Sequence, residues 1–351
     1  MKASIILAFT VGGMVLLTAL LPVQGSSAEK KTAPGYSITD LGPLSTRTAD
    51  DKPGLNAAGT IAAWKVCGDN LFHANLIKGA NETDLGGLPG FENTFAADIN
   101  NKGMVVGVAQ SRDDMRFIRA FFWHDGKMEA LPTLGGKYAD ARGINQPGDI
   151  AGKAQLPDNA TFHAALWSHG KVKDLGILAQ GHFSEAHAIN DDDEIVGDAE
   201  VIPNGHPHAF FWSQGHMQDL GLCPSGNLSS AQAINDKHQV VGYANSRENG
   251  YRPMLWSHGH MTDLGTLGDD PSFALDINNE SQVVGGSYVE EGEERAFLWE
   301  KGELFNLNDL IPAHTNWTLL IAYRINDQGE IVGRGFHNGA AHMFLLRPKS
   351  S

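Results

Sequence analysis

Cysteine is scarce in this sequence, which has only Cys67 and Cys223 among its 351 residues. A framework of several disulfides, the usual support of small secreted domains, is therefore excluded. The repeat positions given below place the two cysteines in units that are not neighbours. Two cysteines whose Cα atoms lie more than about 7 Å apart cannot be bridged, so we expect no intrachain disulfide.

Positive charge is also scarce. The chain carries 26 Lys and Arg residues against 41 Asp and Glu residues, which gives a formal net charge of −15 at pH 7. An excess of negative charge of this size argues against nucleic acid or an anionic membrane surface as the partner. It favours solubility and is compatible with cationic or neutral partners.

Common catalytic motifs are missing too. The sequence contains no G-x-S-x-G, no H-E-x-x-H and no glycine-rich loop of the phosphate-binding kind. No run is long and periodic enough for an amphipathic helix. A pair of carboxylates brought together from different parts of the chain stays an open alternative, because spacing alone does not reveal such a pair.

Only one long hydrophobic run is present, and it lies near the N-terminus. Residues 5–23 are almost entirely apolar, Lys2 precedes them, and the small residues Ser26, Ser27 and Ala28 follow. This pattern predicts a signal peptide over residues 1–28 and a short linker over 29–34. We expect a secreted, extracellular or periplasmic protein, with an uncleaved membrane anchor as the alternative.

The rest of the chain repeats one motif, Ile-Asn followed by a turn and a segment like Val-Val-Gly. The asparagines of the seven copies are Asn56, Asn100, Asn145, Asn190, Asn235, Asn278 and Asn326. Each copy holds four short runs rich in Val, Ile, Phe and Trp, separated by Gly, Asn, Asp and Ser. Such runs are typical of strands and turns. Four strands in a unit of about 40–45 residues is the pattern of a β-propeller blade.

The turns within each unit carry their own signals. The first hairpin has glycine where a residue with positive φ is needed, as at Gly59, Gly103, Gly148 and Gly329. The second closes through a residue followed by glycine, from Lys78-Gly79 in the first unit to Lys301-Gly302 in the sixth.

The two ends of the repeated region complement each other. The last unit has only three strands, ending in residues 341–348, while residues 36–42 match the fourth strands of the other units. We therefore predict an all-β, seven-bladed propeller over residues 35–351, closed by strand 36–42 completing the last blade. Closure of this kind leaves only short, protected sheet edges.

The third strand of each unit has a His or Arg, a small residue, two large apolar residues and often Trp, as in HAFFW at 208–212. In this motif the chain resembles the HAF-repeat proteins, a family of probable extracellular repeat proteins. The resemblance covers nearly all of the chain after the signal, and it implies export and a repeat architecture. We expect the His or Arg to be a structural tie, bonded to a loop carbonyl or to the Asp of the Asp-Leu-Gly segment.

Function is expected where the copies differ and where their side chains can converge, at the upper channel and top loops. Three residues before the repeated Asn stand Arg142, His187, Gln232 and Tyr323, where other copies have Ala or Leu. These side chains either bind a ligand or fill the channel. A second position, one residue after the repeated glycine, varies similarly and holds Lys153, Asp198, Tyr243 and Arg334. Trp317, in the long loop 310–320, either contacts a sugar or aromatic partner or packs inward.

The resulting prediction is a secreted or cell-surface binding or interaction scaffold, monomeric, for an unknown protein or glycan ligand. The alternative is a polysaccharide-active hydrolase or lyase with a carboxylate, His and Tyr site on the top face. No cofactor or metal is expected. A calcium ion at Asp191, Asp192 and Asp193 is the weaker interpretation of that acidic turn, and a solvated hairpin tip is the stronger one.

Overall fold

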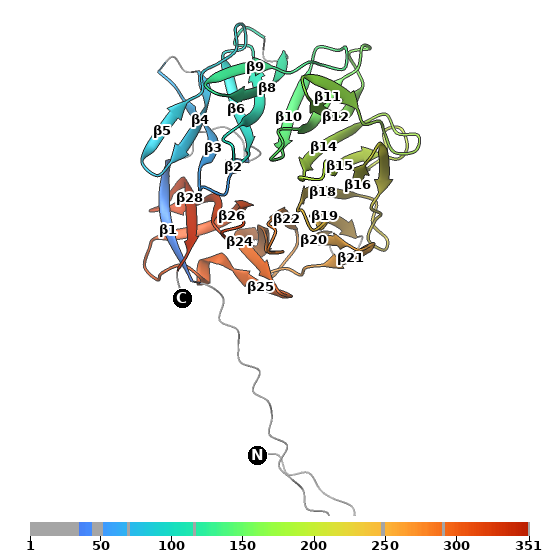
Figure 1. The fold of residues 1–351 in the computed structure, drawn as a ribbon. Coiled ribbons are helices and arrows are strands. Elements are labelled where there is room, and N and C mark those ends of the chain that lie inside the picture. The colour runs from blue at the N-terminus through green and yellow to red at the C-terminus, as the bar shows by residue number, and fades with distance from the viewer. Residues whose placement is uncertain are drawn as a thin grey trace, which may run out of the picture. The chain divides into compact units, whose positions relative to one another are not determined.

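A computed structural model describes residues 35–43, 52–68, 71–114, 117–246, 250–289 and 292–349. These residues form seven four-stranded antiparallel sheets, arranged as blades around a central axis (Figure 1). The prediction of an all-β, seven-bladed propeller is confirmed. The predicted signal peptide and linker, residues 1–34, lie outside the described residues.

Six blades each use four strands that are consecutive in sequence, with the innermost strand first. Blade 1 comprises β2 (Gly54–Leu55), β3 (Ile61–Val66), β4 (Phe72–Lys78) and β5 (Asn81–Asp84). Blade 2 comprises β6 (Asn93–Ile99), β7 (Val105–Gln110), β8 (Ile118–His124) and β9 (Lys127–Ala130). Blade 3 comprises β10 (Ala139–Ile144), β11 (Ile150–Gln155), β12 (Phe162–Ser168) and β13 (Lys171–Asp174).

Blades 4 to 6 repeat this order. Blade 4 comprises β14 (Ser184–Ile189), β15 (Ile195–Glu200), β16 (Pro207–Ser213) and β17 (His216–Asp219). Blade 5 comprises β18 (Ser229–Ile234), β19 (Val240–Ser246), β20 (Gly250–Ser257) and β21 (His260–Asp263). Blade 6 comprises β22 (Ser272–Ile277), β23 (Val283–Val289), β24 (Glu293–Glu300) and β25 (Glu303–Asn306), and a short 3-10 helix, η2 (Leu307–Asp309), follows it.

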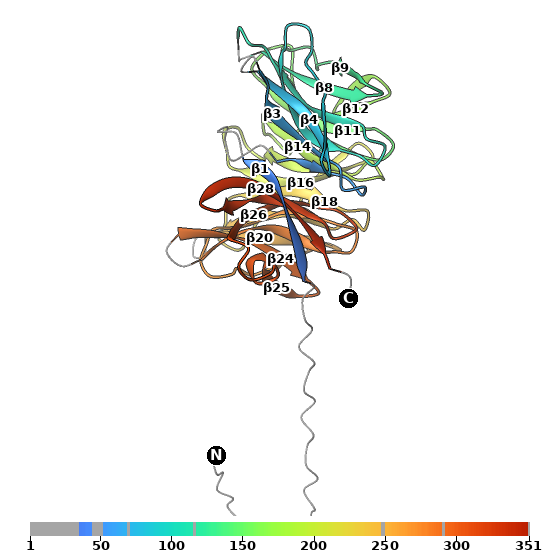
Figure 2. The ribbon, with the colours of Figure 1, turned by 90° about the vertical axis from the view of Figure 1, so that its left-hand side faces the viewer.

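Blade 7 joins the two ends of the propeller. Its strands are β26 (Trp317–Ile325), β27 (Ile331–His337), β28 (Ala340–Pro348) and the N-terminal β1 (Tyr36–Pro43). β1 lies antiparallel to β28, with Tyr36 opposite Pro348 and Asp40 opposite Phe344 (Figure 2). The predicted closure of the ring by the N-terminal strand is therefore confirmed.

The glycine of each Val-Val-Gly segment is required by close packing between the two inner strands of a blade. A Cβ on Gly197 would lie 2.0 Å from the carbonyl oxygen of Glu185, and the glycines of five other blades meet the same obstacle. The large residues of strand 3 then fill the space between blades. Phe121, Phe210 and Phe297 are fully buried there.

The repeated asparagines form a closed ring of hydrogen bonds, which we call the asparagine ring. Each Asn Nδ2 donates to the backbone carbonyl of the corresponding Asn in the next blade, at 2.9–3.3 Å. The bond from Asn326 to Asn56 completes the circle across the ends of the chain. All seven side chains are buried. The repeated Asn thus links neighbouring blades, a role the repeat pattern did not reveal.

The turn predictions hold with one exception. Gly59, Gly103, Gly148 and Gly329 all have positive φ, between 67° and 109°. In blade 1, however, Lys78 pairs with Asn81, so the second hairpin closes through Gly79-Ala80 and not through Lys78-Gly79. Gly79 has a φ of 60° and takes the first loop position, where the other blades have a residue before their glycine.

The predicted ties of strand 3 are confirmed. In five blades the strand-3 His or Arg contacts the Asp of Asp-Leu-Gly at 2.8–3.0 Å, namely His73 with Asp84, His163 with Asp174, His208 with Asp219, Arg252 with Asp263 and His342 with Asp40. Arg119 and Arg295 instead donate to backbone carbonyls. The most frequent residues of the motif are therefore structural. Cys67 and Cys223 belong to different parts of the ring and are free thiols.

Candidate functional site

A cavity of about 270 Å³ lies where the inner strands face one another. Side chains from the chain segment before blade 1 and from blades 2, 3, 4, 5 and 7 line it. They are Lys52, Phe95, Ala96, Ala97, Val108, Ile118, Tyr138, Asp140, Arg142, His187, Gln232 and Arg324. The channel of the propeller therefore contains a pocket of the size that a small molecule would occupy.

A β-bulge in the inner strands of blades 3, 4 and 5 directs three of these side chains into the channel. In blades 3, 4 and 5 the strand register shifts at Arg142, His187 and Gln232, which lie between paired residues. A bulge leaves one residue without a partner opposite and turns its side chain out of the regular alternation. The structure thus brings together three of the residues singled out in the sequence.

The other two candidates lie elsewhere. β26 contains two register shifts, and Arg324 lines the cavity while Tyr323 is buried with 5% of its surface exposed. Trp317 belongs to the start of β26 rather than to a loop. It stacks on His337, with a ring separation of 4.6 Å and an interplanar angle of 2°. Of the two alternatives for Trp317, contact with a sugar or aromatic partner and inward packing, the structure shows inward packing.

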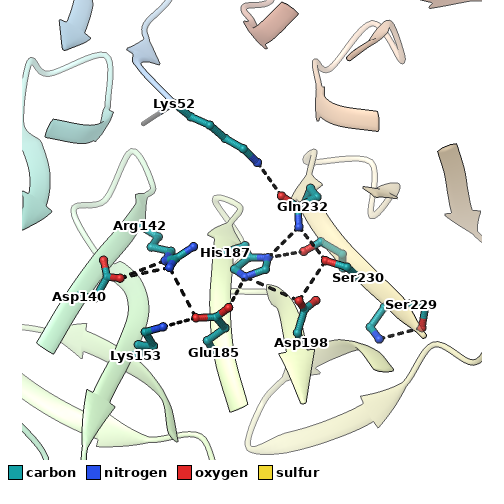
Figure 3. Close-up of polar contacts among 12 residues, drawn as sticks. Lys52, Asp140, Arg142, Lys153, Glu185, His187, Asp198, Ser229, Ser230 and Gln232 are labelled. Carbon is teal, nitrogen blue, oxygen red and sulfur yellow. Dashed lines mark hydrogen bonds and ion pairs between the residues drawn. The ribbon is translucent and has the colours of Figure 1, made fainter. Parts of the chain in front are cut away.

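A continuous chain of polar contacts runs along one wall of the cavity (Figure 3). Lys52 Nζ donates to Gln232 Oε1, and Gln232 Nε2 donates to Ser230 Oγ at 2.7 Å. Ser230 Oγ in turn donates to Asp198 Oδ2 at 3.0 Å. His187 lies between these groups, with its Nδ1 2.9 Å from the carbonyl oxygen of Ala231.

The same chain continues through Glu185. Its Oε1 is 3.2 Å from His187 Nε2, and its Oε2 contacts both Lys153 and the Arg142 guanidinium, the latter at 3.6 Å. Arg142 also pairs with Asp140 at 3.2 Å. Glu185 therefore connects the acidic and basic residues of blades 3 and 4.

Electrostatics follow from this arrangement. Burial raises the pKa of Glu185, but the hydrogen bond from His187 and the charges of His187, Arg142 and Lys153 outweigh it and lower that pKa well below its usual range. Burial likewise opposes the charge on Arg142, yet the carboxylates of Asp140 and Glu185 raise its pKa. Both groups are therefore charged at neutral pH.

Lys52 behaves differently. Burial lowers the pKa of its amine to about 7, and the positive charges of Arg324 and Arg142 act in the same direction. A substantial fraction of Lys52 is thus a neutral amine at physiological pH. Burial raises the pKa of the Asp276 carboxyl in blade 6 to about 6, and Arg324 of the adjacent blade 7 opposes this shift.

The connected polar side chains come from three neighbouring blades. They stand at three positions of these blades: five and three residues before the repeated Asn, and one after the repeated Gly. Blade 3 has Asp140, Arg142 and Lys153; blade 4 has Glu185, His187 and Asp198; blade 5 has Ser230, Gln232 and Tyr243. Blade 2 has Phe95, Ala97 and Val108 at the same positions. The cavity therefore has a charged wall and an apolar wall.

Some residues of the site were not found from the sequence. Lys52 lies four residues before Asn56, where the other six copies all have Ala, so a comparison at that position would have revealed it. Asp140 lies at the position five before the Asn, where Phe95 in the neighbouring copy could have signalled the difference. Arg324 lies two residues before its repeated Asn, where the other copies have Gly, Ala or Asp. Tyr323 takes the bulged position of β26, and Arg324 pairs with Val332.

The acidic turn at 191–193 takes part in contacts between blades. Asp191 Oδ1 accepts from the backbone N–H of Gln146 at 2.8 Å, and Asp193 Oδ1 accepts from Asn145 Nδ2 at 2.9 Å. Both carboxylates thus have a structural role in this turn.

The chain belongs to the family described as a protein of unknown function (DUF3466), whose model matches residues 30–213 and 225–344. This match does not extend to the HAF-repeat proteins, so that resemblance stays a prediction. A comparison with curated proteins gives no match. None of the described residues forms a helix long and apolar enough to cross a membrane.

Solved structures with a similar fold come from proteins of diverse activity. An oligogalacturonate lyase in complex with manganese aligns with a TM-score of 0.58 and 9% identity, over 91% of this chain and 99% of that one. The β-propeller domain of the Trilobed protease from Pyrococcus furiosus aligns with a TM-score of 0.57 and 12% identity, over 90% and 96%. A puromycin-hydrolyzing peptidase from Mycobacterium tuberculosis has the same TM-score and identity, over 91% and 55%. At these identities the likeness shows the fold alone.

Proposed function

We propose that this protein is an exported binding propeller whose channel cavity takes a small acidic ligand, such as a glycan that contains uronic acid residues. One observation carries the proposal. Arg142 and Arg324 come from separate blades and line one cavity beside the amine of Lys52, in a chain whose formal net charge is −15. Cationic side chains gathered in an otherwise acidic protein favour an anionic ligand.

The hydrogen-bonding groups suit a carboxylate. A guanidinium presents several N–H donors in a planar fork that matches the two oxygens of a carboxylate. Arg142 and Arg324 both line the cavity, and Gln232 and His187 add polar groups beside them. A ligand rich in hydroxyl groups would find further partners along this wall.

The apolar wall suits the less polar face of a sugar ring. Phe95, Val108, Ile118 and Tyr138 line the cavity together. A pocket with a few polar groups on one side and apolar or aromatic surface on the other both orients a ligand and removes it from water. An acidic sugar has both kinds of surface.

Calorimetric titration of the purified protein tests this proposal. Oligogalacturonate is expected to bind, while its methyl-esterified form and a neutral galactose oligomer bind at least tenfold more weakly. Arg324→Gln should reduce oligogalacturonate affinity at least tenfold. Arg347→Gln is the matched control, because Arg347 pairs with Glu330 and does not line the cavity. Equal binding of the acidic and neutral oligomers would contradict the proposal.

A second candidate function is a polysaccharide lyase or hydrolase that uses the same cavity. Two features of the channel favour it. The amine of Lys52 is readily deprotonated and could accept a proton, and His187 contacts Glu185 in the same channel. The fold shared with an oligogalacturonate lyase is compatible with it. Incubation with polygalacturonate distinguishes the two functions, since a lyase produces unsaturated ends that absorb ultraviolet light and a hydrolase produces only new reducing ends. Binding without either product supports the scaffold.

Export and the monomeric state belong to the same proposal. Export rests on the apolar run at 5–23, the small residues after it and the resemblance to HAF-repeat proteins. Mass spectrometry of the mature N-terminus tests cleavage near Ala28, and an intact N-terminus held in the membrane fraction would favour an anchor. Light scattering of the purified protein tests whether it is a monomer.

A further inference from the structure

Blade 7, which closes the ring, and its neighbour blade 1 each add a third metal-binding side chain to the His–Asp tie. The position is four residues after the repeated glycine, or after Ala63, its counterpart in blade 1. It holds His337 in blade 7 and Cys67 in blade 1. Blades 2 to 6 have Ser111, Leu156, Val201, Ser246 and Val289 at this position. At this position, side chains that bind transition metals strongly occur only in blades 7 and 1. In each of these two blades the added side chain and the His–Asp tie make a set of three groups.

In blade 7 the three groups lie close together on three neighbouring strands. Asp40 Oδ1 is 2.8 Å from His342 Nδ1, and Asp40 Oδ2 is 3.0 Å from His337 Nδ1. One atom from each residue lies within 4.8 Å of the others. The side chains are partly open, with 18–35% of their surface exposed. An ion could reach them from solvent.

Blade 1 shows the same arrangement with a sulfur ligand. His73 Nδ1 is 2.9 Å from both oxygens of Asp84, and Cys67 Sγ is 3.7 Å from Asp84 Oδ2. These ligand atoms also lie within 4.8 Å of one another. Cys67 follows β3 just as His337 ends β27, so the two sets occupy corresponding places in the two blades.

We propose that blades 1 and 7 each bind a divalent transition-metal ion of the zinc type, through Cys67, His73 and Asp84 and through Asp40, His337 and His342. Thiolate, imidazole and carboxylate are the ligands that Zn²⁺ takes in proteins. Three protein ligands leave the fourth tetrahedral position to water. Metal binding displaces the protons that the imidazole nitrogens and the thiol otherwise carry.

Neighbouring side chains hold the blade 7 ligands in place. Trp317 stacks flat against His337, and its ring meets His342 edge-on at 6.1 Å. Asp40 also accepts from the backbone N–H of Gly42 at 2.8 Å. Groups behind the ligands that fix their orientation are a regular feature of metal sites. This role accounts for Trp317 without a sugar ligand.

The blade 7 site would connect the first strand of the propeller to the last two. Asp40 lies on β1, His337 on β27 and His342 on β28. An ion that binds the folded ring and not the unfolded chain stabilises the ring by mass action. The inference is independent of the ligand proposed for the channel cavity.

Metal stoichiometry of the purified protein, carrying no polyhistidine tag, is the decisive measurement. After treatment with EDTA and titration with ZnCl₂, the wild type is expected to bind two ions with micromolar or tighter affinity. His337→Ser and Cys67→Ser should each bind one, and the double variant none. Both substitutions introduce the residue that blades 2 and 5 already have at this position, so the fold is expected to tolerate them.

Further measurements separate the two sites. With Co²⁺, a thiolate-to-metal absorption band should appear in the wild type and in His337→Ser, and disappear in Cys67→Ser. Zinc should raise the melting temperature of Cys67→Ser but not that of the double variant. His163→Ser, which alters the tie of blade 3, serves as the control and should still bind two ions.

Each outcome decides between the possibilities. If the wild type binds one ion and His337→Ser binds none, the blade 7 site is supported and the blade 1 site is overturned. If the wild type binds one ion and Cys67→Ser binds none, the blade 1 site is supported and the blade 7 site is overturned. Binding that neither variant changes, or no binding at micromolar Zn²⁺, overturns the proposal altogether. In that case His337 and Cys67 are only surface variants of the structural tie.

Discussion

Asn278 offers the sharpest test of the asparagine ring. Its Oδ1 accepts from the backbone N–H groups of Glu280 and Gln282, at 3.1 and 2.9 Å, and so shapes its own turn. Its Nδ2 donates to Gln282 Oε1 at 2.8 Å and to the carbonyl of Asn326 in the next blade at 2.9 Å. Only 3% of the residue is exposed. Substitution by Ala removes all four bonds, whereas Asp keeps the acceptor and loses the donor.

The magnitude follows from these contacts. At about 1 kcal/mol for each buried hydrogen bond, Asn278→Ala should destabilise the protein by roughly 4 kcal/mol. Asn278→Asp retains the turn but sets a buried carboxylate against the Asn326 carbonyl. Because an unpaired buried charge is costly, we expect a loss of at least about 2 kcal/mol despite the nearly identical shape.

Urea unfolding followed by tryptophan fluorescence at pH 7 measures both variants. Asn81→Ala, on the exposed strand β5, is the control and should shift the midpoint little. If Asn278→Asp unfolds within about 0.5 kcal/mol of the wild type, a typical surface effect, the bond between blades contributes nothing and the reasoning is refuted.

Three further predictions concern single buried groups. Tyr36 is fully buried, and its hydroxyl has no hydrogen-bond partner among the described residues. Tyr36→Phe should therefore leave the urea midpoint unchanged or higher, while Tyr36→Ala should lower the free energy of unfolding by about 3–5 kcal/mol. A large loss of stability in Tyr36→Phe would reveal a partner for the hydroxyl. The lowered pKa of Glu185 means that its ionised form stabilises the fold above the unfolded pKa of about 4.3 and that this stability disappears as pH falls toward the folded value. Glu185→Gln should therefore be less stable than the wild type at pH 7, with a difference that shrinks below about pH 4; a difference independent of pH would show that charge is not the cause. The amine of Lys52, with a pKa of about 7, should be acylated at pH 7.5 faster than that of the exposed Lys171, as measured by peptide mass spectrometry. Gln232→Asp should raise the pKa of Lys52 and slow its acylation. Equal rates for Lys52 and Lys171 would place the Lys52 amine outside the channel.

The fold was predictable because the same constraint recurs seven times. The Val-Val-Gly segments, the glycine turns and the orphan strand 36–42 each have one structural explanation, and together they require a closed ring of four-stranded blades. The asparagine ring was not predictable in the same way. A single Asn before a turn has a sufficient local role, as Asn278 has toward Gln282, so the repeat gives no sign of its second bond to the next blade.

The candidate site was only partly predictable. Arg142, His187 and Gln232 stood out because they differ from Ala97 at the same position, and the bulges bring all three into the cavity. Lys52 and Arg324 were missed because the comparison stopped at the position three before the repeated Asn. Lys52 lies four before it, where the other copies have Ala, and Arg324 lies two before it, where they have Gly, Ala or Asp. The inner strands bulge next to these positions, so alternation along a regular strand does not predict which of them face the cavity.

The separation between the asparagine ring and the channel wall has a consequence for how such proteins diversify. The one set of bonds that joins all seven blades comes from the repeated Asn, while much of the polar cavity wall comes from the residues five and three positions earlier and from the residue after the glycine. Substitution at these latter positions can therefore change which molecules a propeller recognises while the asparagine ring stays intact. Each blade acts as an exchangeable cassette, and relatives with the same skeleton are free to display different chemistry toward the same central space.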